Sequence, residues 1–127
     1  MTENNAKALQ TIVVDDEWLI RKELISLLTA YDQINIVGEA SNVDEAIQLV
    51  ENIDPDLIFL DIQMPGRTGF HLLESIPQTF DVIFISGYDH MIQQAHQYNA
   101  IDYLTKPIDK KRLALAVNKA LEKRVFS

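Results

Sequence analysis

The chain has 127 residues, 47% of them hydrophobic, which is typical of one globular domain with its own core. Eleven Lys and Arg residues against nineteen Asp and Glu residues give a formal net charge of −8, so this domain is not expected to bind nucleic acid or a membrane surface itself. The chain has no cysteine, no apolar run of membrane-spanning length and no signal peptide, which excludes disulfides and favours a cytoplasmic location.

Five short segments predict β-strands. Three are continuously apolar, as strands buried on both faces are: 11–14, 57–60 and 82–85. Two mix apolar with polar residues, as strands at the edges of a sheet do: 34–38 and 101–105.

Helical segments alternate with these strands. Apolar residues recur at helical spacing in five stretches: 20–28, 43–50, 70–76, 91–98 and 113–121. The stripe in 91–98 is the weakest, and Ser41 and Asp109 each resemble a helix start signal. The alternation predicts an α/β fold, a flavodoxin-like three-layer (βα)5 sandwich whose five parallel strands take the order 2-1-3-4-5.

The domain limits follow from the same reading. We expect a polar N-terminal extension over residues 1–10, one folded domain over 11–124, and the start of a linker to an absent output domain over 125–127.

Four of the predicted strands end in a residue that can do chemistry: Asp15-Asp16, Asp61, Ser86 and Lys106. Because the carboxyl ends of parallel strands meet at one edge of a sheet, folding should gather three carboxylates, a hydroxyl and an ammonium there. Like charges at close range repel, and a hard divalent cation such as Mg²⁺ resolves that repulsion. Such a set can bind and move a phosphoryl group.

Other interpretations stay open from these residues alone. Asp15-Asp16 could be a helix cap, Asp61 and Ser86 turn residues, and Lys106 a surface lysine. A haloacid-dehalogenase-like phosphatase also uses Asp and Mg²⁺, but that class has a second Asp two residues after its nucleophile, where this chain has Gln63. A stand-alone receiver, or a receiver-like binding module that ignores phosphate, is a further alternative.

Taken together and in order, four motifs resemble the receiver domain of bacterial two-component response regulators. The resemblance covers Thr11 to Arg124 and is carried by Val14-Asp15-Asp16-Glu17, Leu60-Asp61-Ile62-Gln63-Met64-Pro65-Gly66, Ile85-Ser86-Gly87 and Tyr103-Leu104-Thr105-Lys106-Pro107.

The resemblance implies a phosphoacceptor and a metal site. Asp61 would accept a phosphoryl group from a sensor histidine kinase. Asp16, Asp61 and the backbone carbonyl of Gln63 would bind Mg²⁺, with Asp15 helping through water. The domain would then be regulatory, with no substrate to turn over beyond its own phosphoryl group.

It also implies a switch. Ser86 and Lys106 would each contact a phosphoryl oxygen, and Tyr103 would turn inward as Ser86 moves. The peptide bond before Pro107 would be cis. The changed face, made by the fourth helix, fifth strand and fifth helix, would alter binding, including homodimerisation on phosphorylation.

The segment from Tyr88 to Leu104 is similar to receivers that precede a LytTR-type DNA-binding domain. The resemblance therefore points to control of transcription, with DNA bound by an output domain rather than by these residues. Gln63 and Tyr88 occupy positions that vary in the family and flank the expected phosphoryl site, and Gly87 stands where many relatives have Ala.

Overall fold

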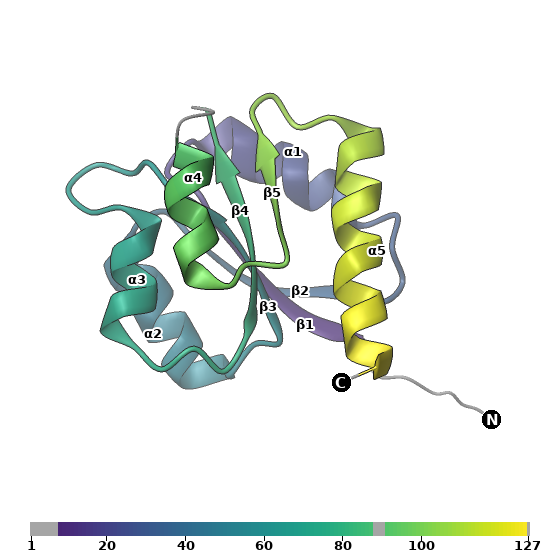
Figure 1. Cartoon of the computed structure of the whole chain (residues 1–127), viewed down its shortest axis with the longest axis horizontal. Coiled ribbons are helices and arrows are strands. Elements are labelled where there is room, and N and C mark those ends of the chain that lie inside the picture. The colour runs from purple at the N-terminus through teal and green to yellow at the C-terminus, as the bar shows by residue number, and fades with distance from the viewer. Residues whose placement is uncertain (1–7, 88–90, 127) are drawn as a thin grey trace.

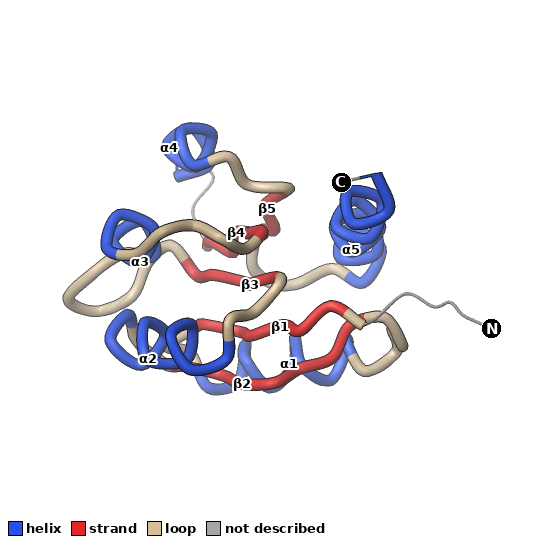
Figure 2. The backbone as a smooth tube through the Cα atoms, turned by 90° about the horizontal axis from the view of Figure 1, so that it is seen from below, coloured by secondary structure: helices blue, strands red, loops and turns tan. Residues whose placement is uncertain are grey.

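The five predicted strands form one parallel sheet. The structure is a computed structural model and describes residues 8–87 and 91–126. The strands are β1 (Leu9–Val14), β2 (Ile34–Ala40), β3 (Leu57–Asp61), β4 (Asp81–Ser86) and β5 (Asp102–Thr105). Their order is β2-β1-β3-β4-β5, which confirms the prediction and can be followed across the sheet in Figure 2.

The sheet is covered on both faces, and this explains the continuously apolar runs. Successive residues of a strand point to opposite faces. In β3, Ile58 and Leu60 belong to one apolar cluster, whereas Leu57 and Phe59 belong to the other. All four side chains are fully buried, so neither face of β3 leaves room for a polar residue before Asp61.

Helices divide between the two faces (Figure 1). One cluster packs under α2 (Val43–Ile53), α3 (Gly69–Ser75) and α4 (Met91–Ala95). The other packs under α1 (Trp18–Leu28) and α5 (Lys110–Phe126). In the described part of the chain, no helix is both long and apolar enough to cross a membrane.

Three boundaries differ from the prediction. β1 begins at Leu9, which is buried, so the expected extension over 1–10 contributes two residues to the sheet, and residues 1–7 lie outside the described part. Helix α5 continues to Phe126, past the expected start of the linker, and Ser127 is outside the described residues. The α2 cap is Asn42 rather than Ser41, because the Asn42 side chain accepts a hydrogen bond from the Glu45 backbone N–H at 2.9 Å.

The weak helical pattern over 91–98 folds as two short pieces. Helix α4 ends at Ala95, and a 3-10 turn, η1, runs over His96–Tyr98 before Asn99 adopts a left-handed conformation. Only Met91 and Ala95 of α4 are buried, so few apolar contacts hold a longer helix. The cap expected at Asp109 is present, since its Oδ2 accepts a hydrogen bond from the Arg112 backbone N–H at 2.9 Å.

Candidate functional site at the carboxyl edge of the sheet

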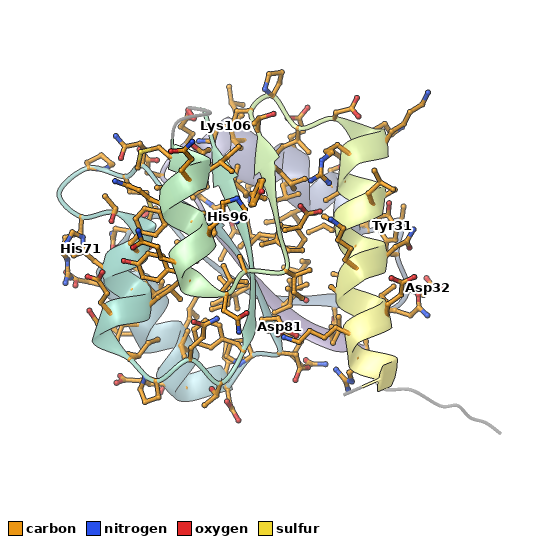
Figure 3. All side chains as sticks on the ribbon, in the orientation of Figure 1. Tyr31, Asp32, His71, Asp81, His96 and Lys106 are labelled. Carbon is orange, nitrogen blue, oxygen red and sulfur yellow. The ribbon has the colours of Figure 1, made fainter. Side chains whose placement is uncertain are left out.

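The polar strand ends meet at one edge of the sheet. Asp15 follows β1, Asp61 ends β3, Ser86 ends β4 and Lys106 follows β5. The Lys106 backbone N–H donates to the Ser86 carbonyl at 2.9 Å, which continues the β4–β5 pairing to the lysine. Figure 3 places Lys106 at this edge and Asp81, the first residue of β4, at the opposite one.

Three carboxylates lie close together there. Oxygens of Asp15, Asp16 and Asp61 all lie within 4.8 Å of one another. Asp15 and Asp61 are fully buried, whereas Asp16 is partly exposed. Burial and, next, the Asp15 charge raise the pKa of Asp61 to about 8, and Lys106 only partly offsets them. Burial also raises the pKa of Asp15, although the hydrogen bond from the Glu17 backbone N–H and the charge of Lys106 act to lower it. Without a cation, the site therefore favours a proton over a full set of charges.

Lys106 is the one ammonium at this edge in the described part of the chain. Its Nζ lies 3.3 Å from Asp61 Oδ2, 3.2 Å from Asp15 Oδ2 and 2.8 Å from Glu17 Oε1. Burial alone would lower the pKa of Lys106, but the hydrogen bond to Glu17 and the charges of Asp61 and Asp15 outweigh burial and raise that pKa. The lysine is therefore charged throughout the physiological range.

Among the described residues, the acidic edge offers carboxylate oxygens that a hard cation could bind, and two of these buried oxygens lack a good hydrogen bond. Asp61 Oδ1 is buried and accepts no hydrogen bond from the described residues. Asp15 Oδ2 also accepts none of good geometry, although Lys106 Nζ lies nearby. Buried polar atoms are rarely left in this state unless something else binds them. Carboxylate oxygens are the ligands that Mg²⁺ takes, so Asp15, Asp16 and Asp61 could hold it.

The β1–α1 loop is held in part by Arg21 and Glu39, which were not predicted as site residues. Arg21 Nη1 donates to the Asp15 carbonyl at 2.7 Å, while Arg21 Nε donates to Glu39 Oε1 at 2.7 Å. The Glu17 backbone N–H donates to Asp15 Oδ1 at 2.8 Å. The sequence does hold a signal for this contact. Arg21 lies about one helical turn after the acidic run 15–17, and from there its side chain can reach back to that run.

The β3–α3 loop brings a glycine against the acceptor candidate. A Cβ added at Gly69 would lie 2.5 Å from the Asp61 carbonyl oxygen and 3.0 Å from Leu60 Cγ. The Gly69 backbone N–H donates to the Ile62 carbonyl at 2.8 Å, so the loop closes tightly over the end of β3. The side chain of Gln63, the next predicted site residue, is exposed in this loop.

Tyr103, the predicted switch residue, is half-buried on β5. Its hydroxyl lies 3.1 Å from His96 Nε2, and the two rings meet edge to face with centroids 5.3 Å apart. His96 belongs to η1, directly after α4. Ser86 is buried at the end of β4, and the Lys106–Pro107 peptide bond is cis. Tyr88, Asp89 and His90 lie outside the described residues, so the structure does not place the first part of the LytTR-like segment.

A buried ion pair links β5 to α5. Asp102 is 5% exposed and accepts two hydrogen bonds from Arg112, at 2.8 and 2.6 Å, while Lys119 Nζ lies 3.3 Å away. Burial alone would raise the pKa of Asp102, but these cations and the Tyr103 backbone N–H outweigh it and lower that pKa. This pairing, which was not predicted from the sequence, fixes α5 against the strand that carries Tyr103.

Comparisons with known proteins agree with this geometry. Residues 11–118 match the response regulator receiver domain family. An uncharacterized response regulatory protein from Vibrio cholerae is 43% identical over 115 residues, 89% of this chain and 48% of its own length. The sensory transduction protein LytT from Bacillus cereus is 36% identical over 114 residues, 87% of this chain and 46% of its own.

Among solved structures, the response regulatory domain of protein mrkE from Klebsiella pneumoniae superposes with a TM-score of 0.84 at 25% identity. The superposition covers 94% of this chain and 100% of that one. The chain spans about half the length of the curated relatives it matches. With the family match over most of its length, this chain belongs to the response regulator receiver domains.

Proposed function

We propose that this domain is the phosphoacceptor of a two-component system and that Asp61 receives a phosphoryl group from a sensor histidine kinase. The observation that carries the proposal is the Asp61 carboxylate itself. It is buried at the tip of β3, one of its oxygens lies 3.3 Å from Lys106 Nζ, and the other accepts no hydrogen bond from the described residues. A carboxylate in this setting can act as a covalent acceptor.

The proposed step is a displacement at phosphorus. A carboxylate oxygen of Asp61 attacks the phosphorus of a phosphohistidine, and a P–O bond forms as the P–N bond breaks. The electron pair of that bond returns to the imidazole nitrogen, which takes up a proton from water. The product is an acyl phosphate, and the proposed contacts of its oxygens are Lys106, whose Nζ lies 3.3 Å from Asp61 Oδ2, and Ser86, which is buried at the end of β4.

Mg²⁺ is the proposed cofactor, and the clustered carboxylates of Asp15, Asp16 and Asp61 support it. As the family resemblance implies, Asp16, Asp61 and the Gln63 carbonyl would bind it and Asp15 would help through water. When bound, it would supply positive charge that keeps the carboxylates ionised and neutralises the phosphoryl oxygens. This matters because a protonated carboxyl is a poor nucleophile, and the pKa of Asp61 is about 8 without the cation.

The proposed output is a change of the face made by α4, β5 and α5. Ser86 and Lys106 move toward the phosphoryl group, and Tyr103 follows inward, which requires its hydrogen bond to His96 to break. That change controls a partner surface, including a homodimer formed on phosphorylation. In the whole protein we propose that the partner is a LytTR-type DNA-binding domain in the cytoplasm, so that this domain is regulatory and controls transcription.

Incubation with acetyl phosphate and Mg²⁺, followed by intact-protein mass spectrometry, tests the acceptor. We expect wild type and Asp102→Asn, a matched loss of a buried carboxylate elsewhere, to gain one phosphoryl mass. Asp61→Asn should gain none. Equal uptake by Asp61→Asn would refute the assignment, and steady turnover of a phosphate ester would indicate a phosphatase instead.

A further inference from the structure

Lys106 makes its shortest contact outside the three-carboxylate site. Its Nζ donates to Glu17 Oε1 at 2.8 Å, against 3.3 Å to Asp61 and 3.2 Å to Asp15. The Glu17 side chain is 50% exposed, whereas those of Asp61 and Asp15 are 1% and 0% exposed. The lysine is thus drawn toward the solvent side of the edge by a fourth carboxylate.

The backbone of Glu17 is held on both sides, so this contact is part of the loop geometry. The Glu17 N–H donates to Asp15 Oδ1 at 2.8 Å, and the Glu17 carbonyl accepts from the Arg21 N–H at 3.0 Å. Glu17 is also the N-cap residue of α1. Its side chain therefore reaches Lys106 from a fixed backbone position.

The three N–H groups of the ammonium are shared among three carboxylates. A phosphoryl oxygen on Asp61 would need one of them. If Lys106 left Asp15, a fully buried carboxylate would lose its cation, which is costly. If Lys106 left Glu17, water could solvate the exposed carboxylate, and exposed pairs contribute little. The contact with Glu17 is therefore the one that gives way.

We propose that Glu17 is a positioning residue that holds Lys106 in the unmodified domain and competes with the phosphoryl group for it. This inference rests on the proposed phosphoacceptor role of Asp61. Glu17 slows uptake and weakens binding of a phosphoryl-like anion, because its bond to Lys106 must break before the ammonium can turn to that anion.

The test compares Glu17→Gln with Glu23→Gln at saturating Mg²⁺. Glu23 is exposed on α1, and the described part of the structure gives it no ion pair, so the control removes the same charge. We expect Glu17→Gln to bind beryllium fluoride about two- to fivefold more tightly than wild type, the range of an exposed ion pair, and to react correspondingly faster with acetyl phosphate. Glu23→Gln should match wild type. Fluorescence of Trp18, the single tryptophan and the neighbour of Glu17, reports binding without a need for turnover.

A double-mutant cycle shows whether the effect passes through the lysine. In a Lys106→Met background, Glu17→Gln should give no more gain than Glu23→Gln. The inference is overturned if Glu17→Gln and Glu23→Gln behave alike while wild type is modified, or if the Glu17→Gln gain persists without Lys106. If wild type neither binds beryllium fluoride nor takes up a phosphoryl group, the proposed function fails as well.

Discussion

Replacing Asp61 by Asn should stabilise the metal-free domain, and the gain should depend on pH. Burial and the neighbouring Asp15 raise the pKa of Asp61 from 3.8 to about 8. Between those values the folded domain holds a proton that the unfolded chain has released. The contribution of Asp61 to stability is therefore fully present below pH 4 and is lost as the pH rises to 8.

The magnitude follows from that difference. One pKa unit corresponds to about 1.4 kcal/mol, so a pKa difference of about four sets a ceiling of about 6 kcal/mol above pH 8. The variant also loses an attraction, because the amide no longer offers Lys106 a charge at 3.3 Å, and water can enter the metal-free edge of the wild type. We therefore expect Asp61→Asn to be about 1–3 kcal/mol more stable than wild type at pH 9 and nearly equal to it at pH 5.

Urea unfolding in EDTA at pH 5, 7 and 9 measures this difference. With a slope of about 2 kcal/mol per molar urea, a gain of 2 kcal/mol moves the midpoint by about 1 M. The matched control is Asp102→Asn, which removes another buried carboxylate, whose pKa is lowered because its cations and the Tyr103 backbone N–H outweigh burial. That variant should be less stable than wild type, and the difference should be the same at all three pH values. The reason is that Asp102 is ionised there in both the folded and the unfolded chain.

A gap between wild type and Asp61→Asn that is the same at pH 5 and pH 9 would contradict the electrostatic explanation. A variant that is less stable than wild type at pH 9 would contradict it more directly. Added Mg²⁺ should close the gap at pH 9 by stabilising wild type, because a ligand stabilises the state that binds it.

Three further predictions follow from the contacts of the site. Mg²⁺ affinity, measured by Trp18 fluorescence, should fall as the pH drops below 8, by up to about tenfold per pH unit, because a proton on Asp61 competes with the cation; affinity that is constant from pH 8 to 6 would exclude this competition. Gly69→Ala should lower the free energy of unfolding by about 1–3 kcal/mol, because its Cβ would meet the Asp61 carbonyl oxygen at 2.5 Å; Gly87→Ala, with open space around the added Cβ, should be nearly neutral in the same urea series. His96→Ala should tighten beryllium fluoride binding about two- to fivefold, because it removes a hydrogen bond that must break when Tyr103 turns inward; unchanged binding would show that this bond does not oppose the switch.

The sheet was predictable because its geometry imposes a simple pattern on the chain. A strand covered by helices on both faces needs an apolar residue at every position, and 57–60 and 82–85 have one. Edge strands are freer, and β2 and β5 accordingly mix buried and exposed residues. The cap of α2 was assigned one residue early because Ser41 and Asn42 are both good capping residues, and the sequence does not show which of them reaches Glu45.

The candidate site was less predictable where it depends on contacts between distant residues. That Asp15, Asp61 and Lys106 share one edge follows from the topology alone. The bond between Glu17 and Lys106 joins residues 89 positions apart and depends on how far two flexible side chains reach. In the sequence, Asp102 is one of the polar residues of a predicted edge strand. In the structure it is buried, because Arg112 and Lys119 cover it from α5.

Charge at this edge connects stability with function. In the described part of the chain, the ammonium of Lys106 contacts Asp15, Glu17 and Asp61, and Asp16 lies beside Asp15 and Asp61. Four carboxylates and one ammonium leave a formal excess of three negative charges when all are ionised. A proton or Mg²⁺ relieves that excess, which adds to burial in raising the pKa of Asp61. A substitution that removes one of these carboxylates should therefore stabilise the metal-free fold and weaken cation binding together. The acidic edge destabilises the free domain because it is built to bind positive charge, so stability and Mg²⁺ affinity should move in opposite directions across a series of such variants.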